Sequence, residues 1–349
     1  MPTYATAGEV ADAAREALAP EVWEYVSGGA GTEATLRRNR AALDALLLRG
    51  RVLRDVSAVR ADTTFLGIPL SSPVLLAPIG TIGLFDADGA ATCARAAARA
   101  GSAAFVSILA TPSLEDVASA APDAPLLYQH YTRSDRGWTL DIVRRVEAAG
   151  YRGLCLTLDS AVDGVREREL RNRFDRGAAQ ARPNIAPGHD RRELQAELTW
   201  PDVAWLAEQT ELPLLVKGVT DPDDARLAVD AGAAAVIVSN HGGRQLDHQA
   251  ATIELLGPVV EAIGDRAEVA VDGGFERGAD VVKALALGAR AVLIGKAACY
   301  ALAAGGEDAL AETLERLRVE VDRTLALLGV TAPDEVASAH VRVSPAPFS

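Results

Sequence analysis

The chain has 349 residues, 49% of them hydrophobic, with a formal net charge of −13 and a pI of about 4.9. Such an acidic surface repels nucleic-acid phosphates and anionic membranes, so neither is an expected partner. The three cysteines are far apart and have neither disulfide nor metal-ligand spacing, which suits a reducing cytoplasm and no bound metal. The first residues also lack the basic start and apolar core of a signal peptide.

The first 60 residues favour helices. The stretch T-E-A-T-L-R-R-N-R-A-A-L at 32–43 has helical character, and Thr32 is of the type that caps a helix N-terminus. We expect residues 1–60 to form an N-terminal helical extension that packs over the main domain.

A repeated unit follows, in which a helix rich in small apolar residues ends at a glycine and a short β-like run begins soon after. The unit occurs at 96–107, 146–157, 227–239 and 284–295. Four glycines suit the left-handed position that ends a helix: Gly101, Gly150, Gly232 and Gly288. The strands are near-continuous apolar runs, as expected for a parallel sheet covered on both faces.

With the other short apolar runs, the chain contains eight predicted strands, at 74–78, 103–107, 126–131, 153–158, 213–217, 234–239, 268–272 and 291–295. Eight β/α units in order predict an α/β protein with one (β/α)8 TIM-barrel domain over residues 1–349. A doubly wound open sheet is the alternative, because a count of eight does not establish closure.

The connection between the fourth and fifth predicted strands, residues 159–212, is the longest. Its middle, 175–192, is polar, contains proline and glycine, and has no periodicity. We expect an active-site loop region here, either a lid or a disordered insertion.

Residues suited to a binding site, most of them polar or glycine, lie at or just after the end of every predicted strand. They are Pro78, Ile79, Gly80, Ser107, Gln129, Tyr131, Thr157, Asp159, Lys217, Ser239, His241, Arg244, Asp272, Gly273, Gly274, Gly295 and Lys296, with Arg166 and Arg277 shortly after. Because the carboxyl ends of barrel strands meet at one face, these residues are expected to form a single site.

The residue types at the strand ends indicate a chemistry. His241 is a candidate base, and Asp159 is suited to hold a charged imidazole. Arg244 and Arg166 present planar forks for a carboxylate, and Tyr131 is suited to bond a substrate oxygen. A set of glycines and cations resembles the phosphate site that barrels form after strands seven and eight: Gly273, Gly274, Arg277, Gly295 and Lys296.

Four motifs resemble those of a known family: S-N-H-G-G-R-Q-L-D (239–247), V-K-G-V (216–219), D-G-G-F-E-R-G-A-D-V (272–281) and A-L-G-A-R-A-V-L-I-G-K (286–296). They are similar to the FMN-dependent 2-hydroxy acid oxidases and dehydrogenases, the family of glycolate oxidase, lactate oxidase, mandelate dehydrogenase and lactate monooxygenase. The resemblance covers nearly the whole chain. It implies FMN as the cofactor, an L-2-hydroxy acid as the substrate, molecular oxygen as an acceptor, and a homotetramer or larger assembly.

The resemblance also implies a role for each residue. His241 is the base, Asp159 stabilises its imidazolium, and Tyr131 bonds the substrate oxygen. Arg244, Arg166 and Tyr25 hold the substrate carboxylate. Lys217 stabilises negative charge on the reduced flavin. The other implied cofactor contacts are Pro78, Ile79, Gly80, Ser107, Gln129, Thr157, Ser239 and Asp272, with Gly273, Gly274, Arg277, Gly295 and Lys296 at the phosphate.

Several positions depart from the family pattern. Glu276 occupies the place of an arginine that contacts the FMN phosphate, and Lys296 replaces a second arginine. A carboxylate beside a phosphate dianion is repulsive, so we expect weakened FMN retention or a reshaped phosphate site that uses Arg277 and Lys296. Leu109 stands where a bulkier Trp is common and Gly80 where Ala is common, and we expect both changes to enlarge the substrate cavity.

Other functions stay open on the sequence alone. Within the family, the chain is an oxidase, a dehydrogenase, or a lactate monooxygenase-type enzyme that decarboxylates its product oxidatively. A different class is a flavin-free barrel isomerase or aldolase, with Lys217 forming a Schiff base. A catalytically idle flavin-binding protein is suggested only by Glu276.

Overall fold

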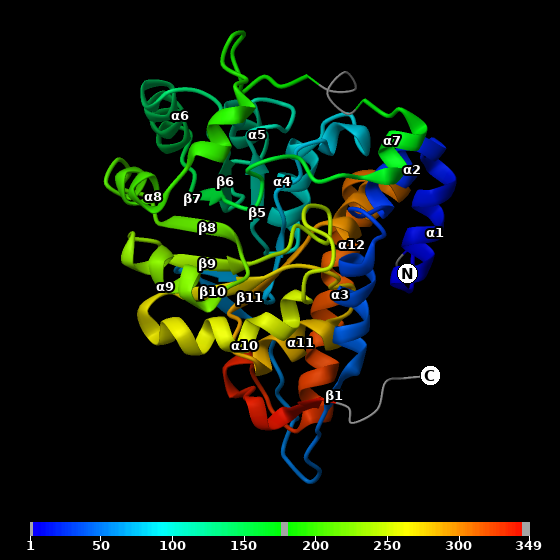
Figure 1. Ribbon diagram of the computed structural model, residues 1–349. Helices are drawn as coiled ribbons and strands as arrows, with labels where there is room; N and C mark the ends of the chain where they lie inside the picture. The colour runs from blue at the N-terminus through cyan, green and yellow to red at the C-terminus, as the bar shows by residue number, and fades with distance from the viewer. Residues whose placement is uncertain (1–2, 176–180, 344–349) are drawn as a thin grey trace.

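Eight parallel strands close into a barrel in the computed structural model, which describes residues 3–175 and 181–343 (Figure 1). The barrel strands are β4 (Val74–Leu76), β5 (Ala104–Ser107), β6 (Leu126–His130), β7 (Leu154–Thr157), β8 (Leu214–Val219), β9 (Ala235–Val238), β10 (Glu268–Val271) and β11 (Ala291–Ile294). The predicted TIM barrel is confirmed. The open-sheet alternative is wrong, because β11 pairs with β4, with Val292 opposite Val74 and Ile294 opposite Leu76.

Helices follow the strands and surround the barrel. They are α4 (Ala90–Arg99), α5 (Leu114–Ala120), α6 (Arg136–Ala148), α7 (Glu167–Asn172), α8 (Trp200–Ala207), α9 (Pro222–Asp230), α10 (Thr252–Ile263), α11 (Gly278–Ala286) and α12 (Lys296–Leu328). Helix α12 is kinked at Gly305 and Gly306, where the backbone leaves the helical conformation. The glycines predicted to end helices, Gly101, Gly150, Gly232 and Gly288, all have positive φ, as that position requires.

The barrel interior is built in layers. One layer is apolar and consists of Leu75, Phe105, Leu127, Cys155, Leu215, Ile237, Ala270 and Leu293. An antiparallel hairpin of β2 (Thr63–Phe65) and β3 (Ile68–Leu70) packs Phe65, Ile68 and Leu70 against this layer. Because side chains alternate along a strand, residues two positions further on face the same way. That spacing places Ser107, Gln129, Thr157, Lys217, Ser239 and Asp272 at the carboxyl-end mouth of the barrel.

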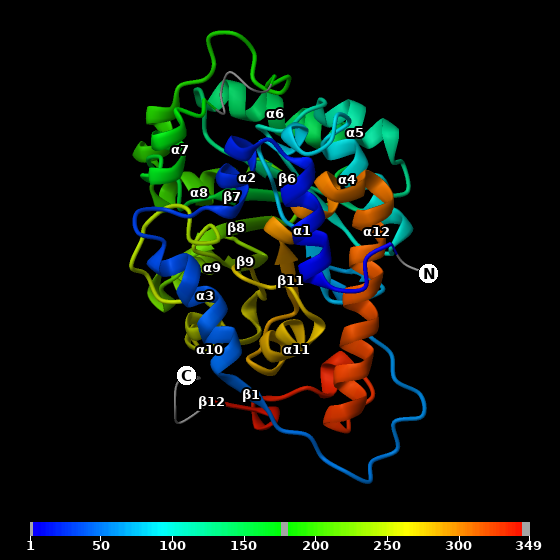
Figure 2. The ribbon, with the colours of Figure 1, turned by 90° about the vertical axis from the view of Figure 1, so that its right-hand side faces the viewer.

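The N-terminal extension contains α1 (Ala7–Ala17), α2 (Pro20–Ser27) and α3 (Ala34–Ala45). Helix α1 lies along α12 (Figure 2). The helical prediction for residues 1–60 holds only to Ala45: β1 (Leu46–Leu48) pairs with the C-terminal β12 (Val341–Val343), and 49–62 has neither helix nor strand.

The predicted capping role of Thr32 is wrong. Helix α3 begins at Ala34, and its N-cap residue Glu33 makes no side-chain cap. Asp247, from the loop after β9, instead accepts hydrogen bonds from the Thr32 hydroxyl at 3.0 Å and the Thr35 amide at 2.8 Å. A carboxylate at a helix N-terminus satisfies free amides and complements the helix dipole. The consequence is that α3 is attached to the loop that carries His241.

The region 159–212 is more ordered than an irregular loop. It contains α7, a 3-10 turn (Arg192–Glu197) and α8, while residues 176–180 of the predicted irregular middle lie outside the described residues. Gln195 ties the region to the strand ends, because its Oε1 accepts from the Thr132 amide at 2.8 Å and its Nε2 donates to the Thr157 carbonyl at 2.7 Å. The region therefore covers the mouth of the barrel.

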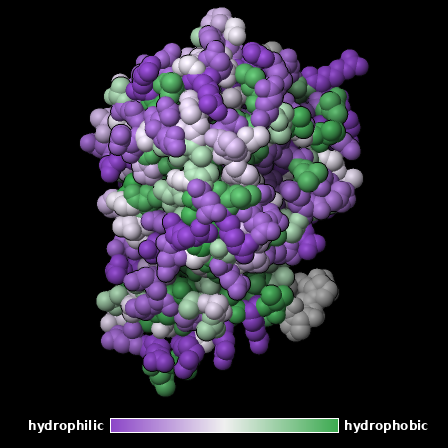
Figure 3. Space-filling view, turned by 60° about the vertical axis from the view of Figure 1, so that its left-hand side comes forward, coloured by the Kyte–Doolittle hydropathy of each residue, from purple (hydrophilic) through white to green (hydrophobic). Residues whose placement is uncertain are grey.

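The surface is mixed in character. The face in Figure 3 is mainly hydrophilic, with hydrophobic residues in small groups. Among the described residues, none of the helices is both long and apolar enough to cross a membrane.

Candidate active site

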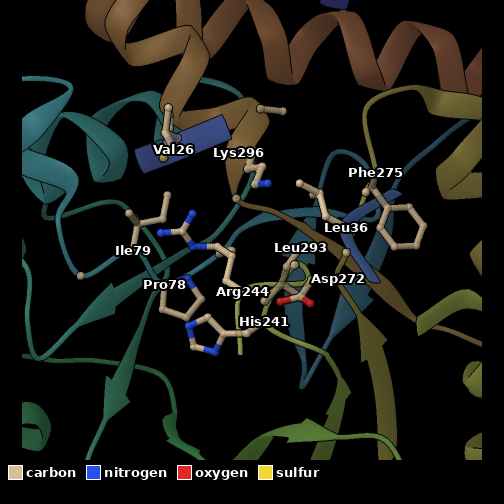
Figure 4. A pocket seen from close by; sticks show the side chains of 18 of the residues that line it. Val26, Leu36, Pro78, Ile79, His241, Arg244, Asp272, Phe275, Leu293 and Lys296 are labelled. Carbon is tan, nitrogen blue, oxygen red and sulfur yellow. The ribbon is translucent and has the colours of Figure 1, made fainter. Parts of the chain in front are cut away.

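Two adjoining cavities open at the carboxyl ends of the barrel strands. The first has a volume of about 220 Å³ and the second about 150 Å³. Seven residues line both: Tyr25, Pro78, Gly80, Thr81, Tyr131, His241 and Arg244. In Figure 4 the side chains of Arg244, His241 and Asp272 project into the first cavity, and Lys296 reaches towards it from the start of α12. The two cavities are therefore parts of one site.

Most of the predicted site residues meet here. The first cavity is also lined by Ile79, Thr157, Lys217, Asp272, Gly273, Gly274, Gly295 and Lys296. The second is also lined by Ser107, Gln129 and Arg166. Asp159 and Ser239 lie just behind the lining, and each bonds a residue that faces the cavity. Arg277 is half-exposed and lines neither cavity.

His241 is held in position by Asp159. Its Nδ1 lies 3.0 Å from Asp159 Oδ1 and 3.2 Å from Oδ2, so the carboxylate fixes the ring and leaves Nε2 as the acceptor. Burial opposes ionisation of Asp159, but the neighbouring His241 and Lys217 outweigh it and lower the pKa of the carboxyl group. Asp159 is therefore a carboxylate that orients the His241 ring.

The turn after β9 explains the two glycines beside His241. His241, Gly242 and Gly243 have φ of 57°, 64° and 76°, all in the left-handed region. A Cβ on Gly243 would lie 2.6 Å from the backbone nitrogen of Leu36 in α3. The close approach of α3 and the reversed backbone together require glycine here.

Lys217 is a buried ammonium group with two partners. Its Nζ lies 2.8 Å from Asp272 Oδ2 and donates to Ser239 Oγ at 2.6 Å. Burial favours the neutral amine, but Asp272 and Asp159 outweigh it and raise the pKa of Lys217 above its ordinary value. A Schiff-base lysine needs the opposite shift, so this environment argues against the aldolase alternative.

Two arginines share one carboxylate beside Tyr25. Arg166 lies 3.3 Å and Arg244 3.5 Å from Glu169 Oε1. The guanidinium of Arg244 stacks 4.7 Å from the centroid of the Tyr25 ring and donates to the Tyr25 carbonyl at 2.6 Å. The Tyr25 hydroxyl lies 2.7 Å from Thr81 Oγ1. Both guanidinium groups line the second cavity, where they suit the carboxylate of a substrate.

The first cavity fits FMN. Thr157 Oγ1 and Asp272 Oδ1 are buried without a hydrogen-bond partner among the described residues, which suits a polar ligand. Lys217 supplies a buried cation, and Gly274 has a φ of 89°, which disfavours a side chain whose Cβ would lie 3.2 Å from Asn39 Cβ. A flavin ring, ribityl chain and phosphate need such mixed polar, cationic and glycine-lined walls.

The expected phosphate end is lined by Lys296, Glu276 and Arg40, whose guanidinium donates to the Gly274 carbonyl at 3.0 Å. Lys296 Nζ donates to the carbonyls of Ser27 and Gly28 at 3.0 Å each, and burial together with Arg244 lowers its pKa to about 7. Glu276 lines the first cavity and lies 3.8 Å from Arg277. The structure therefore brings Lys296 and Glu276, but not Arg277, to this end.

The residues of the site that were not predicted include Thr81, Glu169 and Arg133. Arg133 lies in the loop after β6, two positions after Tyr131, so its place just beyond a strand end was the available signal. Glu169 and Thr81 carry no such signal, because their partners are distant in the sequence. A Cβ on Gly80 would lie 3.0 Å from Leu109 Cβ, and the expected enlargement of the substrate cavity stays a prediction. Leu109 thus occupies the space that glycine leaves.

Comparisons with known proteins agree with this geometry. The sequence profile of the FMN-dependent dehydrogenase family matches residues 14–343. The chain is 40% identical to L-lactate oxidase from Nostoc sp., covering 95% of this chain and 96% of the relative. It is 41% identical to glycolate oxidase 1 from Oryza sativa subsp. indica, covering 94% and 93%.

Solved structures give the same result. A mandelate oxidase bound to (S)-4-hydroxymandelic acid has a TM-score of 0.90 at 36% identity, covering 97% of this chain and 98% of that one. A mandelate oxidase variant with a C4a-OH-FMN adduct has a TM-score of 0.88 at 38% identity, covering 96% and 98%. The chain belongs to the FMN-dependent 2-hydroxy acid oxidase and dehydrogenase family. It is an FMN-dependent oxidoreductase acting on CH–OH, and the flavin-free alternative is wrong.

Proposed function

We propose that this enzyme oxidises an L-2-hydroxy acid to the 2-keto acid, with molecular oxygen as the final acceptor and hydrogen peroxide as the second product. The observation that carries the proposal is the pairing of His241 with Asp159 beside the two arginines that share Glu169. This arrangement offers a base and a carboxylate site around a common cavity. The names of the lactate and glycolate oxidases that resemble the chain support the same substrate class.

The residues act on the substrate as follows. Arg244 and Arg166, with Tyr25, bind the substrate carboxylate, and Tyr131 donates to its hydroxyl oxygen. This places the hydroxyl-bearing carbon near His241, whose Nε2 accepts the proton released on oxidation. FMN, when bound, accepts the two electrons. Asp159 stabilises the resulting imidazolium, and Lys217 stabilises negative charge at the adjacent end of the first cavity.

The cofactor is held along the first cavity in this proposal. Thr157 and Asp272, whose Oγ1 and Oδ1 have no hydrogen-bond partner among the described residues, bond the ring and ribityl chain together with Ser107, Gln129 and Ser239. Pro78, Ile79 and Gly80 form the wall beside the ring. Gly273, Gly274, Gly295 and Lys296 receive the phosphate. A contact from Arg277 to the phosphate stays a prediction that needs its side chain to turn towards the cavity.

Anaerobic absorption spectroscopy tests the proposal. The purified holoenzyme is mixed with a panel of 2-hydroxy acids without oxygen, and bleaching of the visible flavin band reports oxidation of a substrate. Analysis of the products formed in air then shows how oxygen is used. We expect the 2-keto acid together with hydrogen peroxide. A carboxylic acid shorter by one carbon would instead indicate oxidative decarboxylation of the monooxygenase type. Failure of every 2-hydroxy acid to bleach the flavin would overturn the proposal.

We also propose a cytoplasmic homotetramer. Support comes from the family resemblance and from the three cysteines, which are all free and buried. Sedimentation velocity of the purified holoenzyme checks the assembly, and a monomer at micromolar concentration would contradict it.

A further inference from the structure

The second cavity contains more positive charge than one substrate carboxylate requires. Five arginines line it: Arg133, Arg166, Arg182, Arg192 and Arg244. The only acidic residue in that lining, among the residues the structure describes, is Asp163. Arg166 and Arg244 are the pair already assigned to the carboxylate next to the reacting carbon. The other three form a separate group, called here the distal arginines.

Carboxylates near the distal arginines offset only part of their charge. Asp190 lies 2.6 Å from Arg182, 3.8 Å from Arg133 and 4.0 Å from Arg192. Asp163 lies 3.0 Å from Arg192. Within the described part of the chain, two carboxylates, Asp190 and Asp163, therefore serve the three distal arginines. A group of three guanidinium groups around two carboxylates suits a further carboxylate from the ligand.

Arg133 is the distal arginine whose environment most needs a ligand. The residue is 8% exposed, and its buried Nε has no hydrogen-bond partner among the described residues. Burial of an incompletely bonded guanidinium group is costly, and an anion in the cavity would remove that cost. The main chain is fixed on both sides, because the Thr132 amide bonds Gln195 and the Arg133 carbonyl accepts from Arg191 at 2.8 Å.

The position of Arg133 also sets the length of the ligand. Its guanidinium lies 5.2 Å from the centroid of the Tyr131 ring, and Tyr131 is the residue assigned to the substrate hydroxyl. An anionic group on Arg133 is therefore close to the reacting carbon, within the reach of a short carbon chain.

We propose that the substrate is dianionic: a short 2-hydroxy dicarboxylate whose distal carboxylate binds Arg133, assisted by Arg182 and Arg192. The inference rests on the proposed function and specifies its substrate class. A terminal phosphate ester shares this anion chemistry and is distinguished in the test.

Matched pairs of substrates test the proposal on the holoenzyme. L-malate is compared with L-2-hydroxybutyrate, and L-2-hydroxyglutarate with L-2-hydroxyvalerate, so that each pair differs by the distal carboxylate at equal carbon number. 3-Phosphoglycerate is also assayed, to test whether a terminal phosphate ester can replace the distal carboxylate. We expect kcat/KM for the favoured dianion to exceed that of its matched monoacid by about tenfold or more, as for one charge-assisted hydrogen-bonded contact. Equal or higher values for the monoacids, or for mandelate, would overturn the inference.

Variants locate the effect. Arg133→Gln is expected to lower the dianion-to-monoacid ratio about tenfold. The control Arg144→Gln, which removes the same charge from an exposed residue of α6, should leave the ratio unchanged. Arg192→Gln changes an arginine on the more exposed side of the cavity, and we expect it to lower the dianion-to-monoacid ratio by a smaller factor. This variant tests the proposal if Arg133→Gln does not fold. An unchanged ratio in the folded distal variants contradicts the proposal.

Binding without turnover gives an independent readout. Succinate and butyrate lack the hydroxyl group, and their dissociation constants are measured from changes in the flavin spectrum. Succinate should bind more tightly, and Arg133→Gln should remove the difference. If the enzyme oxidises monoacids but shows no dianion preference, this inference fails while the proposed function stands. If no 2-hydroxy acid reduces the flavin, the proposed function itself fails.

Discussion

At the scale of single residues, the orientation of His241 depends on one carboxylate, Asp159, which lies 3.0 Å from its Nδ1. We propose that this carboxylate also stabilises the imidazolium formed during catalysis. We expect Asp159→Asn to slow flavin reduction by about 10²–10⁴-fold, because the amide offers no negative charge to the imidazolium. Anaerobic stopped-flow spectroscopy measures this rate. Asp141→Asn, at an exposed residue, is the control. A rate within about threefold of the native value would contradict the role of Asp159.

The ammonium of Lys296 predicts a pH dependence of cofactor binding. Its pKa of about 7 leaves it largely neutral above that pH in the FMN-free protein, and an adjacent phosphate dianion raises the pKa. Binding then takes up a proton, so FMN affinity falls between about pH 7 and 9, by at most about tenfold per pH unit. Quenching of FMN fluorescence by the apoprotein gives the dissociation constant. Lys296→Arg keeps its positive charge over this pH range, so FMN affinity should change less with pH in this variant. If affinity falls equally with pH in the native protein and in Lys296→Arg, no phosphate lies at Lys296.

Glu276 is expected to weaken cofactor retention, because its carboxylate lines the cavity near the proposed phosphate position. We predict that Glu276→Arg lowers the dissociation constant for FMN about tenfold, as repulsion is replaced by a charge-assisted contact. Equilibrium dialysis measures the dissociation constant, and the control is Glu261→Arg, which makes the same charge change at an exposed residue of α10. Equal gains in both variants would mean that net charge, and not the site, is responsible.

At the scale of elements, the β2–β3 hairpin supports the apolar layer beneath the site. Phe65 is fully buried against that layer. We expect Phe65→Ala to lower the free energy of unfolding by about 3–5 kcal/mol, from lost burial and the cavity left behind. Denaturant unfolding followed by circular dichroism measures the change. Val52→Ala, at a residue that is 86% exposed, should alter it by less than about 0.5 kcal/mol. Similar effects of both variants would show that the hairpin does not support the barrel.

At the scale of the whole molecule, FMN is expected to stabilise the fold, because it binds the folded barrel and spans several strand ends. At about 100 times its dissociation constant FMN adds about 2.7 kcal/mol, which corresponds to a Tm increase of about 4 °C for a chain of this length. Differential scanning calorimetry of the apoprotein with and without FMN checks this. Riboflavin, which lacks the phosphate, should increase the Tm less than FMN does. An equal increase in Tm would mean that the phosphate end of the cavity does not stabilise the fold.

The architecture was largely predictable because its signals are local. Short apolar runs located all eight barrel strands, and the glycines after the helices identified where each unit turns. Alternation along the strands then indicates which side chains face the mouth. The capping of α3 by Asp247 could not be predicted in this way, since the two segments are joined only by the folded loop after β9.

The sequence by itself determined the kinds of groups at the strand ends: a base, cations for anionic groups, and glycines for close backbone approach. These follow from residue type and two-residue periodicity, which are local properties of the chain. Only the tertiary structure decided that the sheet closes, that Glu169 serves both Arg166 and Arg244, and that Arg133 lies buried beside Tyr131. Those outcomes depend on contacts between distant segments, whose partners are selected by the path of the folded backbone.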